Sequence, residues 1–355
     1  MLATTCRRDR HAGPRSVSPF RVPVRALAGG ADRLQVLFAL GLLALAYGGC
    51  AGHSLKYVVQ RDLLSKDGLT CRGYLGWNSR DVQHVFLWMS GTGVYSSAFI
   101  HPSVVDALNV NPVAYLTFDK PGIRAPFRDP AKLSVNNDEL AQYTQGHMLE
   151  CARQAMIWSQ EHFGHAIHFH FRGHSEGSLV ALFLYEELLS EEPMLAARVS
   201  SLVLSGLALE PFDALVERQL SEMPAKQGGV IRAAIQDCDW GVLRTHLAIS
   251  CKYLDDACAR PSGRSAFESI ALRAPTVSFF VFQGNNDSQT PVRYVRELDA
   301  WNRRFGHLDL TFRYYEGAHV GGPPEVKREL SDLLVRLTAR SPSVRSAPVE
   351  AGALR

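Results

Sequence analysis

From about residue 55 onward, short apolar runs alternate with longer segments that have the hydrophobic periodicity of helices. This alternation is typical of a mostly parallel sheet, because parallel neighbouring strands need a long crossover and a helix usually supplies it. Eight runs have the length and composition of buried strands: 55–64, 69–76, 82–89, 113–118, 167–171, 199–204, 276–282 and 310–315. The sequence therefore predicts an α/β domain over residues 55–340, built on a mostly parallel eight-stranded sheet flanked by helices.

Helical patterns separate these strands, at 138–163, 177–189, 291–305 and 323–339. The stretch 210–274 breaks the alternation and holds helix-like pieces at 212–223, 230–237 and 240–252. We interpret this stretch as a helical cap inserted after the sixth strand, with a separate small domain as the alternative. Residues 341–355 are rich in Ser, Pro, Ala and Arg and are predicted to form a disordered tail.

The formal charge of the 355-residue chain is +3, but this charge is unevenly distributed. Residues 1–33 contain seven Arg and two Asp, a net +5, so the rest of the chain carries −2. The body has no stripe of Lys and Arg interleaved with aromatic residues, which argues against a nucleic-acid partner.

The N-terminal segment has the features of an export leader. An uncharged apolar run at 34–47 is short for a membrane span and suits the h-region of a signal peptide. Gly48-Gly49-Cys50 follows it, so the segment resembles a bacterial lipoprotein signal in which Cys50 would be lipidated, although Tyr47 stands where an aliphatic residue is usual. Cleavage after Ala44-Leu45-Ala46, giving a secreted protein, and retention as a membrane anchor are alternatives. In each case residues 1–50 are a leader and the protein is exported, either to the bacterial cell envelope as a lipoprotein or periplasmic protein, or to the medium.

The chain has seven cysteines, at positions 6, 50, 71, 151, 238, 251 and 258. Their number fits an oxidising compartment without requiring one. Cys251 and Cys258 are close enough in sequence to close a small loop, and the cysteines are equally consistent with small buried hydrophobic residues.

The pentapeptide Gly173-His174-Ser175-Glu176-Gly177 lies between a predicted strand and a predicted helix. A serine hydroxyl is a poor nucleophile at neutral pH, so acyl transfer needs a base and a geometry that exposes the hydroxyl. A Gly-x-Ser-x-Gly turn supplies that geometry, because its glycines let two backbones approach where a side chain would clash. Ser175 is therefore the candidate nucleophile, and a structural turn serine is the alternative.

Two further segments follow Ser175 in the order Ser, acid, His. The acid loop, residues 283–291 (QGNNDSQTP), comes after the seventh strand, and Glu316-Gly317-Ala318-His319 comes after the eighth. With these segments in place the sequence resembles the α/β-hydrolase superfamily of serine hydrolases. The resemblance implies that His319 acts as the base and that Asp287 orients the His319 ring. Both residues would lie on loops at the carboxyl ends of strands. For Asp287 the alternative is a helix-capping role, since Asn-Asp-Ser before a helix is good capping chemistry.

The resemblance also implies an oxyanion hole made of two backbone N–H groups. One belongs to Glu176, directly after the nucleophile. The other belongs to the loop after the third strand, Ser90-Gly91-Thr92-Gly93, where Ser90 replaces the usual His. Thr92 is the first candidate there and Gly93 the second. A phosphate-binding loop is the alternative, but the Lys-Ser/Thr ending of a P-loop is missing. Asp119-Lys120-Pro121-Gly122 resembles another turn of the family and is interpreted as structural.

Four histidines, at positions 162, 165, 168 and 170, precede the nucleophile and raise the question of a metal. No Cys or carboxylate partner has recognisable ligand spacing, so the sequence predicts neither a metal nor a cofactor.

Together these features predict a hydrolase that cleaves a carboxylic ester, or an amide, through an acyl-enzyme. The expected substrate is a small-molecule ester, a lipid or a peptide, selected by the cap, and membrane attachment would come from the N-terminal lipid or anchor. The same triad would also serve an acyltransferase or a peptidase. A non-catalytic envelope binding protein is the alternative of a different class, and a broken triad would be its mark.

Overall fold

The computed structural model describes residues 55–339 except 128, 130, 131, 248, 274, 275, 306, 307, 320 and 321. The predicted leader with Cys50 and the predicted tail at 341–355 lie outside the described residues. Within the described part of the chain, none of the helices combines the length and the apolar character that spanning a bilayer requires.

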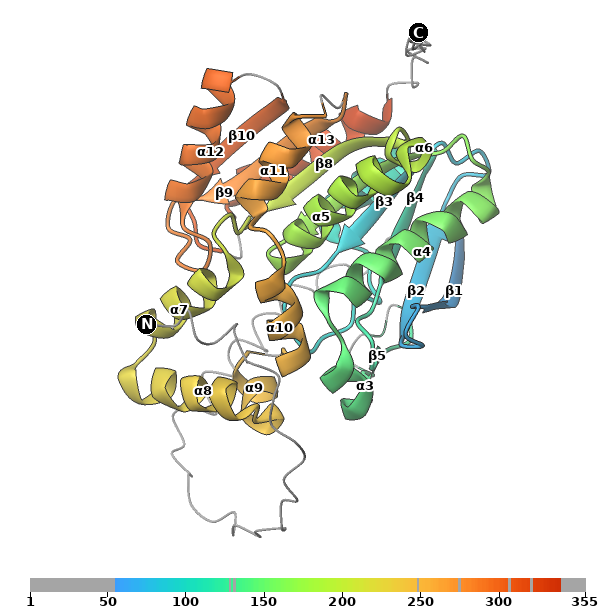
Figure 1. The fold of residues 1–355 in the computed structure, drawn as a ribbon. Helices are drawn as coiled ribbons and strands as arrows, with labels where there is room; N and C mark the ends of the chain where they lie inside the picture. The colour runs from blue at the N-terminus through green and yellow to red at the C-terminus, as the bar shows by residue number, and fades with distance from the viewer. Residues whose placement is uncertain are drawn as a thin grey trace, which may run out of the picture. The chain divides into compact units, whose positions relative to one another are not determined.

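The domain is built on an eight-stranded sheet with the strand order β1-β2-β4-β3-β7-β8-β9-β10 (Figure 1). Its strands are β1 (Tyr57–Leu64), β2 (Thr70–Trp77), β3 (His84–Met89), β4 (Val113–Phe118), β7 (His168–His174), β8 (Val199–Ser205), β9 (Ser278–Gly284) and β10 (Asp309–Tyr315). Only the pairs β1–β2 and β2–β4 are antiparallel. All eight predicted strands are confirmed, with ends displaced by a few residues. A separate two-stranded ribbon joins β5 (Ile123–Arg124) to β6 (Ser134–Val135).

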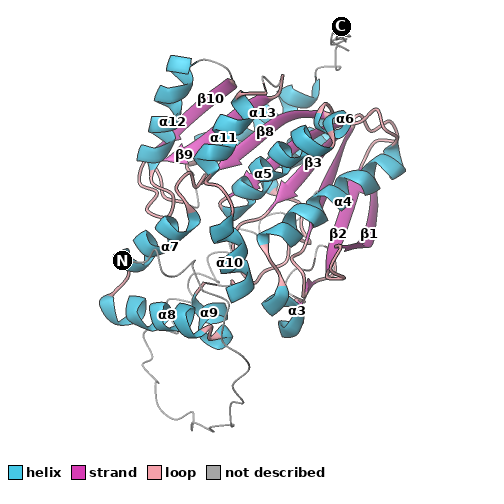
Figure 2. Ribbon diagram, in the orientation of Figure 1, coloured by secondary structure: helices cyan, strands magenta, loops and turns pink. Residues whose placement is uncertain are grey.

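Helices cover both faces of this sheet (Figure 2). One face carries α4 (Gln145–Phe163), α5 (Glu176–Glu191), α11 (Gly263–Ala271) and α12 (Val292–Phe305), and the other carries α2 (Val105–Val110) and α13 (Pro324–Ala339). The sequence explains the two layers, because successive side chains of a strand point to opposite faces and both faces of β3 are apolar. Val85 and Leu87 join the first core, whereas Phe86 and Trp88 join the second. The short elements η1 (Pro102–Val104) and α6 (Pro193–Ala196) complete this part of the fold.

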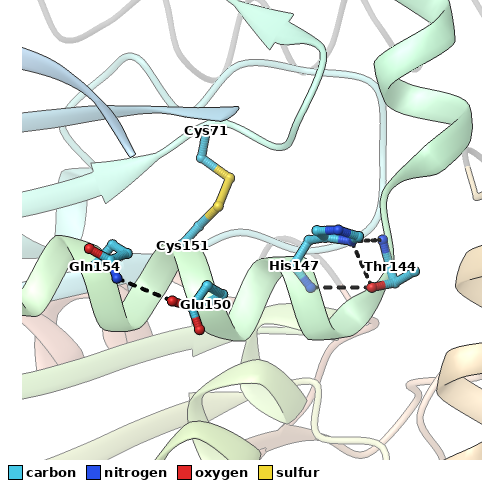
Figure 3. Close-up of a disulfide and its surroundings, with 6 residues drawn as sticks. All are labelled: Cys71, Thr144, His147, Glu150, Cys151 and Gln154. Carbon is cyan, nitrogen blue, oxygen red and sulfur yellow. Dashed lines mark hydrogen bonds between the residues drawn. A yellow bond between two sulfur atoms is a disulfide. The ribbon is translucent and has the colours of Figure 1, made fainter. Parts of the chain in front are cut away.

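The single helix predicted over 138–163 is wrong, because the structure divides it into α3 (Asn137–Gln142) and α4. The break is a capping box. The Thr144 hydroxyl accepts a hydrogen bond from the His147 N–H (3.2 Å), and the His147 ring accepts one from the Thr144 N–H (3.0 Å), as Figure 3 shows. These bonds satisfy N–H groups that a continuous helix would have used, so a new helix starts at Gln145.

The connection between β8 and β9 holds α7 (Phe212–Glu222), α8 (Ala225–Asp237), α9 (Trp240–His246) and α10 (Cys251–Ala259), followed by α11. The helix predicted over 240–252 is wrong, since α9 ends at His246 and α10 begins at Cys251. Ser250 caps α10 by accepting a hydrogen bond from the Tyr253 N–H (3.1 Å). The last helix of the connection, α11, packs against α5, so it belongs to the layer that flanks the sheet.

Two disulfides have both of their cysteines in the described part of the chain. Cys71 of β2 is bonded to Cys151 of α4, and both residues are fully buried (Figure 3). Cys238 is bonded to Cys251, which excludes a Cys251–Cys258 loop. The physical reason is that α10 separates positions 251 and 258 by about 10 Å along its axis, beyond the reach of a disulfide.

Candidate active site

Ser175 lies at the turn from β7 into α5, with φ 55° and ψ −124°. Positive φ is uncommon for a residue with a side chain, and here it turns the chain sharply at the carboxyl end of the strand. The Ser175 N–H donates to the Ser205 carbonyl of β8 (2.8 Å), which fixes the turn to the neighbouring strand. The side chain stays partly exposed between a buried strand and a buried helix. Such a backbone outlier supports a functional interpretation of Ser175.

Both glycines of the pentapeptide lie where two backbone segments approach closely, as the sequence motif predicts. A Cβ at Gly177 would collide with the Met89 carbonyl of β3, and a Cβ at Gly173 would collide with the Gly177 carbonyl. The close approach of strand, turn and helix therefore depends on both glycines.

Asp287 and His319, the acid and base that the resemblance implies, are in direct contact. His319 Nδ1 lies 2.8 Å from Asp287 Oδ2, and both side chains are buried. Asp287 also caps its own loop, since its Oδ1 accepts a hydrogen bond from the Thr290 N–H (2.8 Å). The contact with His319 and the hydrogen bond from the Thr290 N–H thus involve different oxygens of one carboxyl group, so an orienting role and a capping role are compatible at Asp287.

The other bonds of Asp287 favour its ionised form. Its Oδ2 also accepts hydrogen bonds from the Thr290 hydroxyl (2.6 Å) and the Gln283 amide (2.9 Å). Burial alone would raise the pKa of Asp287, but the hydrogen bonds and the charge interaction with His319, together with Thr290, outweigh it and lower the pKa. Asp287 is therefore ionised at neutral pH, and its negative charge would stabilise a protonated His319.

His319 faces the nucleophile turn through His174, the residue before Ser175. The two imidazole rings lie 4.9 Å apart between centroids, and a Cβ at Gly206 would come within 2.6 Å of the His319 ring. His319 Nε2 is buried and has no hydrogen-bond partner among the described residues. It is the nitrogen that a serine nucleophile would use, and contacts of this kind commonly tighten only when a substrate binds.

His174 stays uncharged beside His319. Burial lowers the pKa of His174 to about 3, and the neighbouring His319 and Arg172 add to the shift. Its Nδ1 lies 3.0 Å from the Ser205 hydroxyl, which also accepts a hydrogen bond from Arg172 (3.0 Å). A neutral ring at this place does not repel the positive charge that His319 would acquire.

The loop after β3, residues 90–97, contains the predicted segment 90–93 and lies against the nucleophile turn; we call it the oxyanion loop. A Cβ at Gly91 would come within 3.1 Å of Ser175 Cβ. Thr92 is exposed, and Gly93 has φ 148°, a backbone region that favours glycine. Glu176 is the first residue of α5, so its N–H has no acceptor within the helix. The structure thus brings the loop of Thr92 and Gly93 and the start of α5 together around Ser175.

A buried ion pair that no sequence motif predicts lies at this place. Lys120 Nζ lies 2.8 Å from Glu176 Oε2, and the two side chains are 2% and 3% exposed. The turn that contains Lys120 was interpreted as structural only. A lysine two residues after a buried strand was the available signal, because lysine is rarely fully buried without a partner.

Among the described residues, no group of three or more His, Cys, Asp or Glu side chains is arranged to hold a metal ion. His168 and His170 lie on β7, as expected, and each is bonded to a serine hydroxyl of β8: Ser200 at 3.1 Å and Ser201 at 2.8 Å. His84 of β3 adds a contact of 3.1 Å to His170. These rings therefore cross-link strands.

No family model and no curated protein matches the chain by sequence. Solved structures do resemble it. A putative hydrolase from Agrobacterium vitis S4 aligns with a TM-score of 0.53 at 15% identity, over 80% of this chain and 100% of that one. A Pyrococcus furiosus esterase aligns with a TM-score of 0.52 at 14% identity, over 93% of this chain and 99% of that one. A lipase in an open form aligns with a TM-score of 0.54 at 17% identity, over 80% of this chain and 99% of that one. With the observed sheet, these likenesses show that the chain has the α/β-hydrolase fold.

Proposed function

We propose that this protein is a serine hydrolase that cleaves a carboxylic ester through an acyl-enzyme. The observation that carries the proposal is the combination of Ser175 on a positive-φ turn with the buried Asp287–His319 contact of 2.8 Å. A strained nucleophile turn and an oriented base are the parts that acyl transfer needs.

In this mechanism the Ser175 hydroxyl attacks the substrate carbonyl carbon while its proton passes to His319 Nε2. Asp287 holds the imidazole in the required tautomer and stabilises the imidazolium. The Glu176 N–H and an N–H of the oxyanion loop, Thr92 or Gly93, bind the negative oxygen of the tetrahedral intermediate. Collapse expels the alcohol, which takes the proton from His319. Water then attacks the acyl-enzyme with His319 again as base, releasing the acid and restoring Ser175.

Carboxylic esters are the first choice of substrate because the structures that share the fold include proteins described as esterase and lipase. Lipid esters and peptides come next, and acyl transfer to an acceptor other than water would be recognised by its products. The helices α7–α10 would act as the cap that selects among them. Arg218 of α7 donates hydrogen bonds to the Ser288 and Gln289 carbonyls of the acid loop (2.6 Å each). Movement of α7 would therefore displace the loop that carries Asp287.

Active-site labelling tests the proposal. A fluorophosphonate probe should label the wild-type protein covalently, and Ser175→Ala should abolish labelling while the protein stays folded. His319→Ala should slow labelling strongly, because the serine loses its base. A folded wild type that resists the probe, or labelling that survives Ser175→Ala, would refute the assignment. Esters that differ in acyl length would then define the preference of the cap.

We also propose that the protein is exported and acts in the cell envelope or outside the cell. The buried Cys71–Cys151 disulfide supports an oxidising compartment. If Cys50 is the lipidated residue, Cys50→Ala should move the protein from the detergent phase to the aqueous phase in a partitioning experiment. An unchanged distribution would exclude lipidation of Cys50 as the anchor.

A further inference from the structure

Two consecutive charged residues after β4, Asp119 and Lys120, are almost completely buried, at 1% and 2% exposure. Burying a charge costs several kcal/mol unless partners compensate it. The partners of both residues lie in the oxyanion loop or beside it, on segments that are remote in sequence. This arrangement indicates that the turn has a task beyond closing the sheet edge.

Lys120 joins the two segments that carry the proposed oxyanion-hole donors. Its ammonium group donates to the Gly91 carbonyl (3.0 Å) and to Glu176 Oε2 (2.8 Å). Gly91 directly precedes Thr92, and Glu176 carries the other proposed donor on its own backbone. The Tyr143 ring covers the ammonium group, with its centroid 5.6 Å from Nζ.

Asp119 holds the far end of the same loop. Its carboxylate accepts hydrogen bonds from the Ser96 hydroxyl (2.8 Å to each oxygen) and from the Ser97 N–H. The Tyr74 hydroxyl donates a further bond (2.6 Å). The oxyanion loop is therefore fixed at Gly91 and at Ser96–Ser97 by adjacent residues of one turn, with Thr92 and Gly93 between these points.

We propose that Lys120 is a positioning residue, which sets the spacing of the two oxyanion-hole donors by linking the Gly91 carbonyl to the Glu176 carboxylate. The inference rests on the proposed function. A buried ion pair is poor evidence of stability alone, since apolar residues of similar volume often serve as well. Donors that stabilise a developing oxyanion must, however, be fixed before the reaction, and Lys120 is placed to fix both.

The test separates positioning from folding. Lys120→Met removes both bonds but leaves a buried unpaired carboxylate, so the double variant K120M/E176M, which replaces the pair with apolar side chains, carries the main comparison. Arg153→Met is the matched control. It breaks an ion pair with Glu187 (3.0 Å) between α4 and α5, eleven residues beyond Glu176 along α5. Urea unfolding, kcat and KM for a p-nitrophenyl ester, and the inhibition constant of an alkyl trifluoromethyl ketone are measured for each.

For folded K120M/E176M we expect kcat to fall by about 100-fold, with KM within about threefold of wild type, because a displacement of about 1 Å at a catalytic donor has such an effect. The inhibition constant should rise in parallel, since the ketone adduct carries an oxyanion. R153M should have a lower free energy of unfolding than the wild type, with kcat and the inhibition constant unchanged.

A folded double variant with wild-type kcat and inhibition constant would overturn the role of Lys120 and leave the proposed function intact. A loss of kcat without weaker inhibition would also contradict it. If K120M/E176M does not fold while R153M does, the pair is required for folding and the inference is rejected. A wild type that neither hydrolyses esters nor reacts with a fluorophosphonate would refute the proposed function itself.

Discussion

At the scale of single residues, Gly177 is one of two positions of the nucleophile turn, with Gly173, where a side chain would collide with backbone. A Cβ there would collide with the Met89 carbonyl, and neither β3 nor α5 can withdraw without disturbing the sheet. We expect Gly177→Ala to lower the free energy of unfolding by about 3 kcal/mol and to abolish ester hydrolysis. Urea unfolding and kcat measure the two effects.

Gly229 provides the control for this substitution. It is exposed on α8, and a Cβ at this position would meet no atom within 4 Å. Gly229→Ala should therefore raise the free energy of unfolding by up to about 1 kcal/mol, as alanine restricts the unfolded chain and favours the helix. Equal stabilities for the two variants would contradict the steric argument.

Asp287→Asn tests the orientation of His319. An amide NH₂ in place of the acceptor oxygen favours the wrong imidazole tautomer, so we expect kcat to fall by about 10³–10⁴-fold with little change in KM. Asp309→Asn is the matched control, because Asp309 bonds the Ser278 hydroxyl (2.5 Å) at the amino end of β10, opposite the site. A small effect at Asp287, comparable to that at Asp309, would remove Asp287 from the mechanism.

The contact between Asp287 and His319 could be predicted from the sequence because local pattern and chain order identify both residues. Lys120 and His174 could not be assigned in the same way. Their roles depend on which strands become neighbours, and the Lys120–Glu176 pair joins positions 56 residues apart. The sequence pattern of one segment does not predict a contact between residues so far apart in the chain.

At the scale of elements, the Cys71–Cys151 disulfide joins β2 to α4 across 80 residues, whereas Cys238–Cys251 spans 13. In the chain-entropy model a longer loop loses more freedom in the unfolded state, so removing the first bond should cost about 1.5 kcal/mol more than removing the second. We expect C71A/C151A to lose about 4 kcal/mol of stability and C238A/C251A to lose less. Urea unfolding of both variants gives the comparison, and a larger loss for C238A/C251A would contradict it.

Element existence was predictable here and element continuity was not. The eight strands follow from apolar runs, since burial on both faces leaves little choice of side chain. The break at Thr144 depends on the two hydrogen bonds of a capping box and the break at Ser250 on one capping hydrogen bond, and so few bonds compete closely with one more helical turn. Apolar periodicity continues through both breaks, so a period-based reading merges the helices on either side.

At the scale of the whole molecule, His84 and His170 are buried in the sheet and His174 is half-buried at its edge. Burial lowers the pKa of His84 to about 4, and burial and its neighbours lower that of His174 to about 3. Burial also places the pKa of His170 well below its ordinary value of 6.5. The His84 and His174 rings are therefore neutral in the folded protein at pH 5, where the unfolded chain would bind protons at the same positions.

This difference predicts acid sensitivity. As the pH falls from about 6.5, the unfolded chain binds protons at His84 and His174 that the folded chain does not bind. The free energy of unfolding therefore decreases by about 1.4 kcal/mol per pH unit for each of these two histidines. Asp119 acts in the opposite direction, because burial raises its pKa to about 6 and the folded state holds its proton below that pH. For His84, His174 and Asp119 together we expect a net decrease of about 1.4 kcal/mol per pH unit between pH 6 and pH 5, and His170, whose pKa burial also lowers, adds to it in the same direction.

Urea unfolding at pH 7, 6 and 5 measures this slope, and His84→Asn tests its origin. Asparagine keeps a polar side chain beside His170 but does not titrate, so the slope should fall by about 1.4 kcal/mol per pH unit. His165→Asn is the control: His165 is exposed, so its substitution should leave the slope unchanged. A flat stability profile, or equal slopes for the two variants, would show that the buried histidines do not set the acid limit. If activity falls between pH 6 and pH 5 while the free energy of unfolding stays constant, the loss of activity would be attributed to titration in the active site.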